Sequence, residues 1–181
     1  MKSLETERLN LRMFTPEDAE DVYAYASNPN VGPPAGWAPH KSVEDSRKII
    51  EEIFMPPEAW AICIKGDDRV VGVIALEPDN IRPEANSREL GYNLAEEHWG
   101  KGYMTEAAKE VLRFAFEELG LDQVGICTSR VNRRSQRIIE KCGFTYEGTI
   151  RRYYKIYDGS LRDSMVFSML REEFFAGKDS K

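Results

Sequence analysis

A helical segment placed between two strand-like segments constrains the fold most strongly. Residues 87–94 (SRELGYNL) and 121–129 (LDQVGICTS) have the apolar character and length of strands. Between them, apolar side chains recur at helical spacing from Tyr103 until Gly120 ends the pattern. A helix that joins two strands of one sheet usually makes a right-handed parallel crossover. The middle of the chain is therefore predicted to form a βαβ unit.

The flanking segments predict antiparallel pairing. Residues 59–65 and 69–76 are apolar runs joined by the turn GDD, and residues 144–170 turn at DGS. A further helix is expected from Asn132 to Cys142, because Gly143 follows it directly. Both ends of the sheet are thus predicted to be hairpins.

The N-terminal region predicts a strand over residues 7–14 and two helices. Thr15 and Ser42 are N-cap residue types, and Pro16 occupies the first helical position after Thr15. Proline, glycine and asparagine dominate residues 28–41, which are predicted to be a loop. Trp37 in this loop either covers the core or lines a binding site.

The predicted element order is β-α-α-β-β-β-α-β-α-β-β, which favours an α/β (α+β) fold with one mixed sheet and helices on its faces. A chain of 181 residues has room for one domain with a sizeable core. We expect this domain to span residues 1–176 and residues 177–181 to be a frayed tail.

Composition excludes several classes of protein. The net charge of −6 argues against general nucleic-acid binding, and no apolar run is long enough to span a membrane. A cytoplasmic location is expected, because the N-terminus also lacks a signal-peptide core. Three separated cysteines argue against a disulfide framework, and the two histidines lack partners at metal-ligand spacing, so no metal is expected.

The segment WGKGYMTEA combines two glycines with the start of a helix. It does not match a phosphate-binding P-loop, because Gly102 follows Lys101 where Ser or Thr is required. It also lacks the third glycine of a dinucleotide fingerprint. Glycines at 100 and 102 leave the backbone bare, and the helix beginning near Tyr103 supplies free amide hydrogens. The segment is therefore either a diphosphate site or a tight turn that needs glycines for its own dihedral angles.

A second group of polar residues begins the next helix. Asn132 and Ser135 stand three residues apart where the preceding strand ends, the edge at which such sheets bind ligands. Either residue alone would be read as a helix cap. Residues 130–155 are strongly basic, which indicates either a solvated face or a local phosphate site.

The chain resembles the GCN5-related N-acetyltransferases (GNAT), specifically the Rim-type branch of ribosomal-protein and peptide N-terminal acetyltransferases. The resemblance covers nearly the whole chain and is carried by ELGYNLAEEHWGKGYMTEA and VNRRSQRIIEKCGFTYEGTIRRYY. It implies that the central parallel pair is splayed and that the co-substrate is acetyl-CoA. A bulge near Asn93 and Leu94 would aim backbone groups at the acetyl group and pantetheine.

The resemblance also implies a set of coenzyme-binding residues. The glycine segment would bind the pyrophosphate, Asn132 the pantetheine, and a basic residue such as Arg137 the remote phosphate. Met104 departs from the family pattern, since Gly or Ala is usual there; it either crowds the pantetheine or turns away. The residues implied to contact acetyl-CoA are Asn93, Leu94, Trp99, Gly100, Lys101, Gly102, Tyr103, Met104, Thr105, Asn132 and Arg137.

For the chemistry, Ser135 matches a family hydroxyl near the thiol sulfur, and Glu89 is the preferred general base, acting directly or through water. Glu89 alternatively serves as a surface cross-strand carboxylate. Trp37, Tyr92 and Tyr154 are predicted to contact the acceptor, with Tyr154 standing where some relatives have a second carboxylate. A covalent route through Cys142 is disfavoured, because an apolar helix C-terminus does not activate a thiolate.

The predicted reaction is direct transfer of acetyl from acetyl-CoA to a primary amine. The favoured acceptor is a protein N-terminal α-amine of the ribosomal-protein type. The alternatives are a small amine, such as a polyamine or aminoglycoside, and a non-catalytic acetyl-CoA sensor. Acidic residues early in the chain would suit a basic partner. The sequence leaves formation of a homodimer open.

Overall fold

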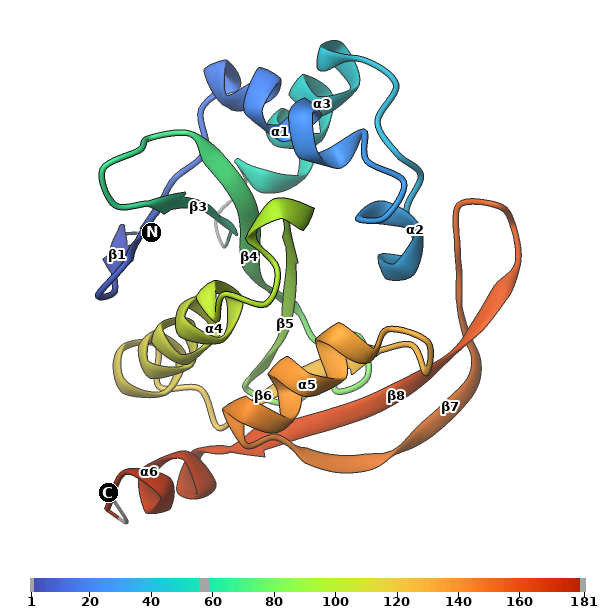
Figure 1. The fold of residues 1–181 in the computed structure, drawn as a ribbon. Helices are drawn as coiled ribbons and strands as arrows, with labels where there is room; N and C mark the ends of the chain where they lie inside the picture. The colour runs from blue at the N-terminus through green and yellow to red at the C-terminus, as the bar shows by residue number, and fades with distance from the viewer. Residues whose placement is uncertain (1, 56–58, 180–181) are drawn as a thin grey trace.

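A computed structural model describes residues 2–55 and 59–179 of the chain (Figure 1). One sheet holds eight strands in the order β1-β2-β3-β4-β5-β6-β8-β7. The strands are β1 (Leu4–Glu5), β2 (Leu9–Arg12), β3 (Ala59–Ile64), β4 (Val70–Pro78), β5 (Ser87–Leu94), β6 (Gln123–Thr128), β7 (Thr145–Lys155) and β8 (Leu161–Leu170). All neighbouring pairs are antiparallel except β5 and β6. The predicted mixed sheet with a central parallel pair is confirmed.

The parallel pair is splayed, as expected. β5 and β6 pair only at Ser87, Arg88 and Glu89 of β5, and then they separate. The expected bulge near Asn93 and Leu94 is wrong, because the β4–β5 ladder runs without a register shift from Pro78↔Arg88 to Gly72↔Leu94. Backbone groups on the far edge of β5 therefore become available because β6 diverges, and not because β5 is kinked.

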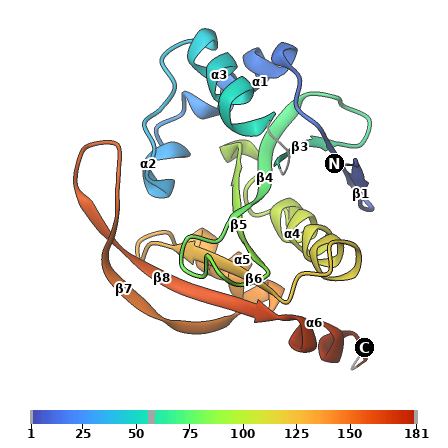
Figure 2. The same ribbon diagram turned by 180° about the vertical axis from the view of Figure 1, so that it is seen from behind.

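Helices cover both faces of the sheet. They are η1 (Pro16–Asp18), α1 (Ala19–Ala26), α2 (Gly32–Ala35), α3 (Val43–Ile49), η2 (Ile50–Phe54), η3 (Glu96–His98), α4 (Tyr103–Arg113), η4 (Phe114–Glu118), α5 (Arg133–Cys142) and α6 (Arg171–Asp179). α4 and α5 lie on one face, and α1 and α3 on the other (Figure 1, and from behind in Figure 2). Each face has its own buried apolar cluster, one around α4 and one around α1. The alternation of β4 explains this, since Ile74 and Leu76 enter the first cluster while Val73 and Ala75 enter the second.

The helix ends follow local chemistry. Asp18 Oδ2 accepts a hydrogen bond from the Thr15 amide at 2.8 Å, and Ser42 Oγ accepts one from the Asp45 amide at 3.1 Å. Gly143 ends α5 in the left-handed region at φ 87°. These three predicted helix boundaries are confirmed.

Some elements differ from the sequence predictions. Residues 28–41 were predicted as loop, yet α2 forms there, with proline in its first turn and left-handed Gly36 at its end. α6 includes residues 177–179 of the predicted tail, while residues 180–181 lie outside the described residues. Among the residues described, no helix has the length and apolar character needed to cross a membrane.

Candidate active site

The glycine segment forms a turn that opens directly into α4. Gly100 and Gly102 have φ values of 73° and 85°, so both lie in the left-handed region that favours glycine. Gly102 is the N-cap, and no side chain caps the helix. Within the described chain, the amide hydrogens of Tyr103, Met104 and Thr105 have no partner. The turn therefore satisfies both interpretations of the glycines: it needs their dihedral angles, and it presents bare amides.

A polar contact from the first hairpin holds this turn in place. Glu106 accepts hydrogen bonds from the Arg8 amide at 2.9 Å and from Thr6 Oγ1 at 2.6 Å. Arg8 also forms an ion pair with Glu106 at 2.6 Å and donates to the Lys101 carbonyl at 3.0 Å. These bonds lower the pKa of Glu106. Glu106 thus fixes the start of α4.

A cavity of about 390 Å³ lies in front of this turn. All predicted coenzyme residues except Lys101 line it, namely Asn93, Leu94, Trp99, Gly100, Gly102, Tyr103, Met104, Thr105, Asn132 and Arg137. Lys101 is exposed outside it. Met104, in the first turn of α4, is 3% exposed and packs into the buried apolar cluster, so most of its side chain turns away from the cavity. Because the bare amides of the turn line this cavity, it is suited to an anionic ligand.

The cationic side of this cavity comes from α5. Arg134, Arg137 and Lys141 line it, whereas Arg133 does not and instead donates to Gln136 Oε1 at 3.0 Å. Arg134 lies over the Trp99 ring at 4.1 Å, and Trp99 Nε1 donates to the Leu94 carbonyl at 2.8 Å. Trp99 therefore links the end of β5 to α5 across the splay. Helical spacing on α5 explains which cations face inward.

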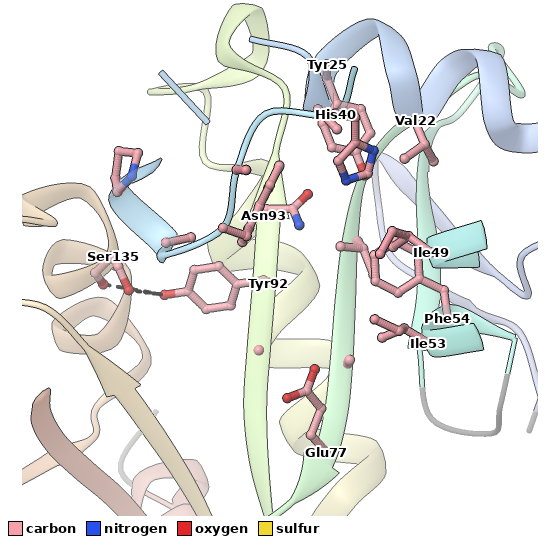
Figure 3. Close-up of a pocket in the computed structure, with 18 of the residues that line it drawn as sticks. Val22, Tyr25, His40, Ile49, Ile53, Phe54, Glu77, Tyr92, Asn93 and Ser135 are labelled. Atoms are coloured by element: carbon pink, nitrogen blue, oxygen red, sulfur yellow. Dashed lines mark hydrogen bonds between the residues drawn. The ribbon is translucent and has the colours of Figure 1, made fainter. Parts of the chain in front are cut away.

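Asn132 and Ser135 meet Tyr92 where the strands separate. Asn132 Oδ1 accepts from the Ser135 amide at 3.2 Å, so the residue does cap α5, and its amide nitrogen remains for other contacts. Ser135 is 8% exposed, and its Oγ lies 3.1 Å from Tyr92 Oη. Burial raises the pKa of Tyr92, which keeps its hydroxyl protonated. The pair is a neutral hydroxyl dyad (Figure 3).

A second cavity, of about 880 Å³, lies on the α1 and α3 side of the sheet. Trp37, Tyr92, Tyr154 and Glu89 line it, so the predicted acceptor residues come together. The β7–β8 hairpin closes one side, because Arg162 donates to the Pro33 carbonyl at 2.9 Å and the Tyr157 amide to the Gly36 carbonyl at 3.1 Å. Figures 1 and 2 both show this hairpin beside α2.

The two cavities share one wall. Tyr92, Asn93, Asn132 and Ser135 line both, together with Pro34 and Ala35 of α2. A group entering from the glycine turn and a group entering from the second cavity would meet at these residues. The splay of β5 and β6 creates this junction, because a fully paired sheet would close it.

Glu89 lies in the second cavity in an environment that disfavours its charge. Burial raises its pKa, and the nearby carboxylates of Asp79 and Glu77 raise it further, while a hydrogen bond with Cys127 and the charge of Arg82 oppose this. Its α-carbon lies about 13 Å along the strand from Asn93, from the rise of four residues. A proton passing between Glu89 and the junction therefore needs water between them.

Glu77 is a cavity residue that sequence reasoning missed. It is the direct cross-strand partner of Glu89, and burial also raises its pKa. Strand alternation from Val73 and Ala75 places it on the same face, but only the β4–β5 register brings it opposite Glu89. The two carboxylates together form an acidic end of the cavity.

Cys142 does not reach this site. It lines neither cavity, and burial raises the pKa of its thiol to about 11. A thiolate is therefore scarce at neutral pH, which agrees with the sequence-based argument against a covalent intermediate.

Residues 8–145 match the family model described as "Acetyltransferase (GNAT) domain". The chain belongs to the GNAT acetyltransferase family. This acetyltransferase is 32% identical over 180 residues to the "Uncharacterized N-acetyltransferase p20" of Bacillus licheniformis, covering 96% of this chain and 99% of that protein. It is 34% identical over 108 residues to YdaF of Bacillus subtilis, provisionally named a ribosomal N-acetyltransferase, covering 60% and 57%.

Solved structures agree with the fold of this acetyltransferase. A GNAT-family acetyltransferase from Bacillus anthracis superposes with a TM-score of 0.83 at 25% identity, covering 95% of this chain and 100% of that one. GNAT-fold acetyltransferases use acetyl-CoA. In the described part of this acetyltransferase, no group of three or more His, Cys, Asp or Glu residues is arranged to hold a metal ion.

Proposed function

We propose that this enzyme transfers acetyl from acetyl-CoA directly to a primary amine, the α-amine of a protein N-terminus. The observation that carries the proposal is the shared wall between the two cavities. One cavity has bare amides and three cations suited to phosphates, and the other has carboxylates suited to an ammonium group. The two substrates would therefore meet without an acyl-enzyme.

In this proposal, the bound co-substrate supplies an activated thioester. The α4 amides and Arg137 hold its phosphates, and Asn132 orients the chain that leads to the junction. Ser135 donates a hydrogen bond to the departing sulfur, with Tyr92 keeping that hydroxyl oriented. Glu89 takes a proton from the acceptor ammonium through water, which leaves the neutral amine to attack the carbonyl carbon. The amine's second proton goes to the thiolate, so the products are an amide and free CoA.

An α-amine needs only a modest base, because its pKa is near 8. The raised pKa of Glu89 makes it a stronger base than an ordinary glutamate. A cavity of about 880 Å³ has room for the first residues of a peptide. The provisional name of YdaF supports a protein acceptor of ribosomal type.

The test is CoA release, measured with a thiol reagent, from acetyl-CoA and four acceptors. These are a lysine-free peptide with a free N-terminus, an N-formylated peptide with one lysine, spermidine and an aminoglycoside. We expect turnover with the free N-terminus and little with the blocked peptide. Turnover only with spermidine or the aminoglycoside would reject the α-amine acceptor, and acetyl-CoA binding without any turnover would reject the proposed reaction.

A further inference from the structure

The second cavity is built in rows along β4 and β5. Three cross-strand pairs face it, namely Glu77↔Glu89, Ala75↔Gly91 and Val73↔Asn93. Successive rows lie about 7 Å apart along the strands. The central row has almost no side chain of its own, and the Glu77 carboxylate leans over Gly91, with Oε1 3.5 Å from where a β-carbon there would stand.

One wall of this cavity, formed by Ile49, Ile53 and Phe54, is apolar. Ile49, Ile53 and Phe54, from α3 and η2, gather beside β4, with Glu77 at one end and Tyr25 and His40 at the other (Figure 3). Ile53 is 53% exposed, so its side chain is accessible to an occupant of the cavity. Along the same wall, Val22 of α1 adds further apolar surface.

Charge limits what can occupy this space. Four carboxylates line the cavity (Asp45, Glu52, Glu77, Glu89), against the two lysines Lys41 and Lys48. An occupant that complements both the apolar wall and this excess of carboxylates carries a cation with an apolar group beside it.

We infer that this acetyltransferase selects acceptors whose first residue has a bulky aliphatic or aromatic side chain, which packs against Ile49, Ile53 and Phe54. This rests on the proposed α-amine acceptor and names its substrate class. A polyamine or aminoglycoside would place charged or hydroxylated atoms against the side chains of Ile49, Ile53 and Phe54, which offer no hydrogen bonds. A small first residue, such as alanine or serine, would leave the wall open to water.

The test compares peptides that differ only in the first residue, which is leucine, phenylalanine, alanine or serine, with spermidine as a further acceptor. CoA release gives kcat/KM for each. Burial of one large apolar side chain in a half-open cavity should favour the leucine or phenylalanine peptide by at least about tenfold. Ile53→Asn should reduce the leucine-to-alanine ratio at least about threefold, because it places an amide on the wall.

Leu119→Asn is the matched control. Leu119 is also an exposed large aliphatic residue, at 45%, and it lines neither cavity. It should leave the ratio and the overall rate unchanged. The inference is overturned if alanine or serine peptides react as well as leucine peptides, if spermidine reacts best, or if both variants behave alike. Absence of CoA release with every peptide would instead reject the proposed α-amine reaction itself.

Discussion

Substitution of Gly100 by alanine separates the two roles that its position allows. Gly100 and Gly66 both have left-handed φ values, of 73° and 89°, and an added β-carbon would meet no atom within 4 Å at either. Gly66 lies in the β3–β4 turn and lines neither cavity, whereas Gly100 lines the smaller one. The two substitutions should therefore cost the same in folding and differ only in ligand binding.

The magnitudes follow from the backbone. A non-glycine residue in the left-handed region costs about 1–2 kcal/mol. For a chain of this length, each kcal/mol lowers Tm by about 2–4 °C. Both variants should show this decrease in thermal unfolding without ligand. If a diphosphate contacts the bare turn, the methyl group of Gly100→Ala should also weaken CoA binding by at least about tenfold, or about 1.4 kcal/mol.

Calorimetric titration with CoA, on both variants and the wild type, measures this difference. We expect Gly66→Ala to bind CoA as the wild type does. If Gly100→Ala binds CoA as tightly as Gly66→Ala, the glycine serves only the dihedral angles of the turn. The assignment of the diphosphate to this backbone would then be wrong.

Other substitutions test the remaining roles. Arg137→Ala should weaken CoA binding about tenfold while Arg133→Ala leaves it unchanged, and 3′-dephospho-CoA should remove the difference if Arg137 contacts that phosphate. Ser135→Ala should lower kcat about 10- to 100-fold with little change in CoA affinity, and an unchanged kcat would exclude the hydrogen bond to sulfur. The rate should rise with pH as Glu89 loses its proton, at a pH above the ordinary glutamate pKa. Glu77→Gln removes a neighbouring negative charge, so it should shift this rise in rate to lower pH. A pH–rate profile that does not shift would show that Glu77 does not influence the group that titrates.

The same raised pKa has a consequence for stability. The folded protein favours the neutral form of Glu89, so this preference stabilises the fold below the ordinary glutamate pKa and is lost as pH rises through the raised value. Glu89→Gln should therefore not lower the free energy of unfolding at neutral pH, although it should lower the rate. Thermal unfolding at pH 5 and pH 7.5 measures this, and marked destabilisation at pH 7.5 would indicate a structural role.

Local signals in the sequence were enough to predict most of the fold. Thr15, Ser42 and Gly143 carry their own capping signals, and the segment between residues 87 and 129 has the strand–helix–strand pattern that dictates a parallel crossover. α2 was missed because proline and glycine usually mark loops, while tertiary bonds, such as the one from Arg162, help to hold this short helix. The bulge was wrongly expected because pairing register depends on the partner strand.

The parts of the candidate site that lie in short sequence motifs could be predicted from the sequence. The glycine turn and the Asn132–Ser135 pair are contiguous in sequence, so their residue types revealed them. Glu77 and the apolar wall depend on register and helix placement between segments far apart in the chain, which no motif records. Only the structure shows which basic residues of α5 line the smaller cavity, since the sequence does not distinguish Arg134, which lines it, from Arg133, which does not.

The short pairing between β5 and β6 leaves a seam through the middle of the sheet. In the part of the chain that the structure describes, the β5–β6 ladder holds three residue pairs, and Trp99 with Arg134 adds one of the bridges farther along. A molecule bound in that gap would touch both halves and tie them together. At a ligand concentration one hundred times Kd, such binding adds about 2.7 kcal/mol to the free energy of unfolding. The supply of acetyl donor would then govern how long the protein survives as well as how fast it works.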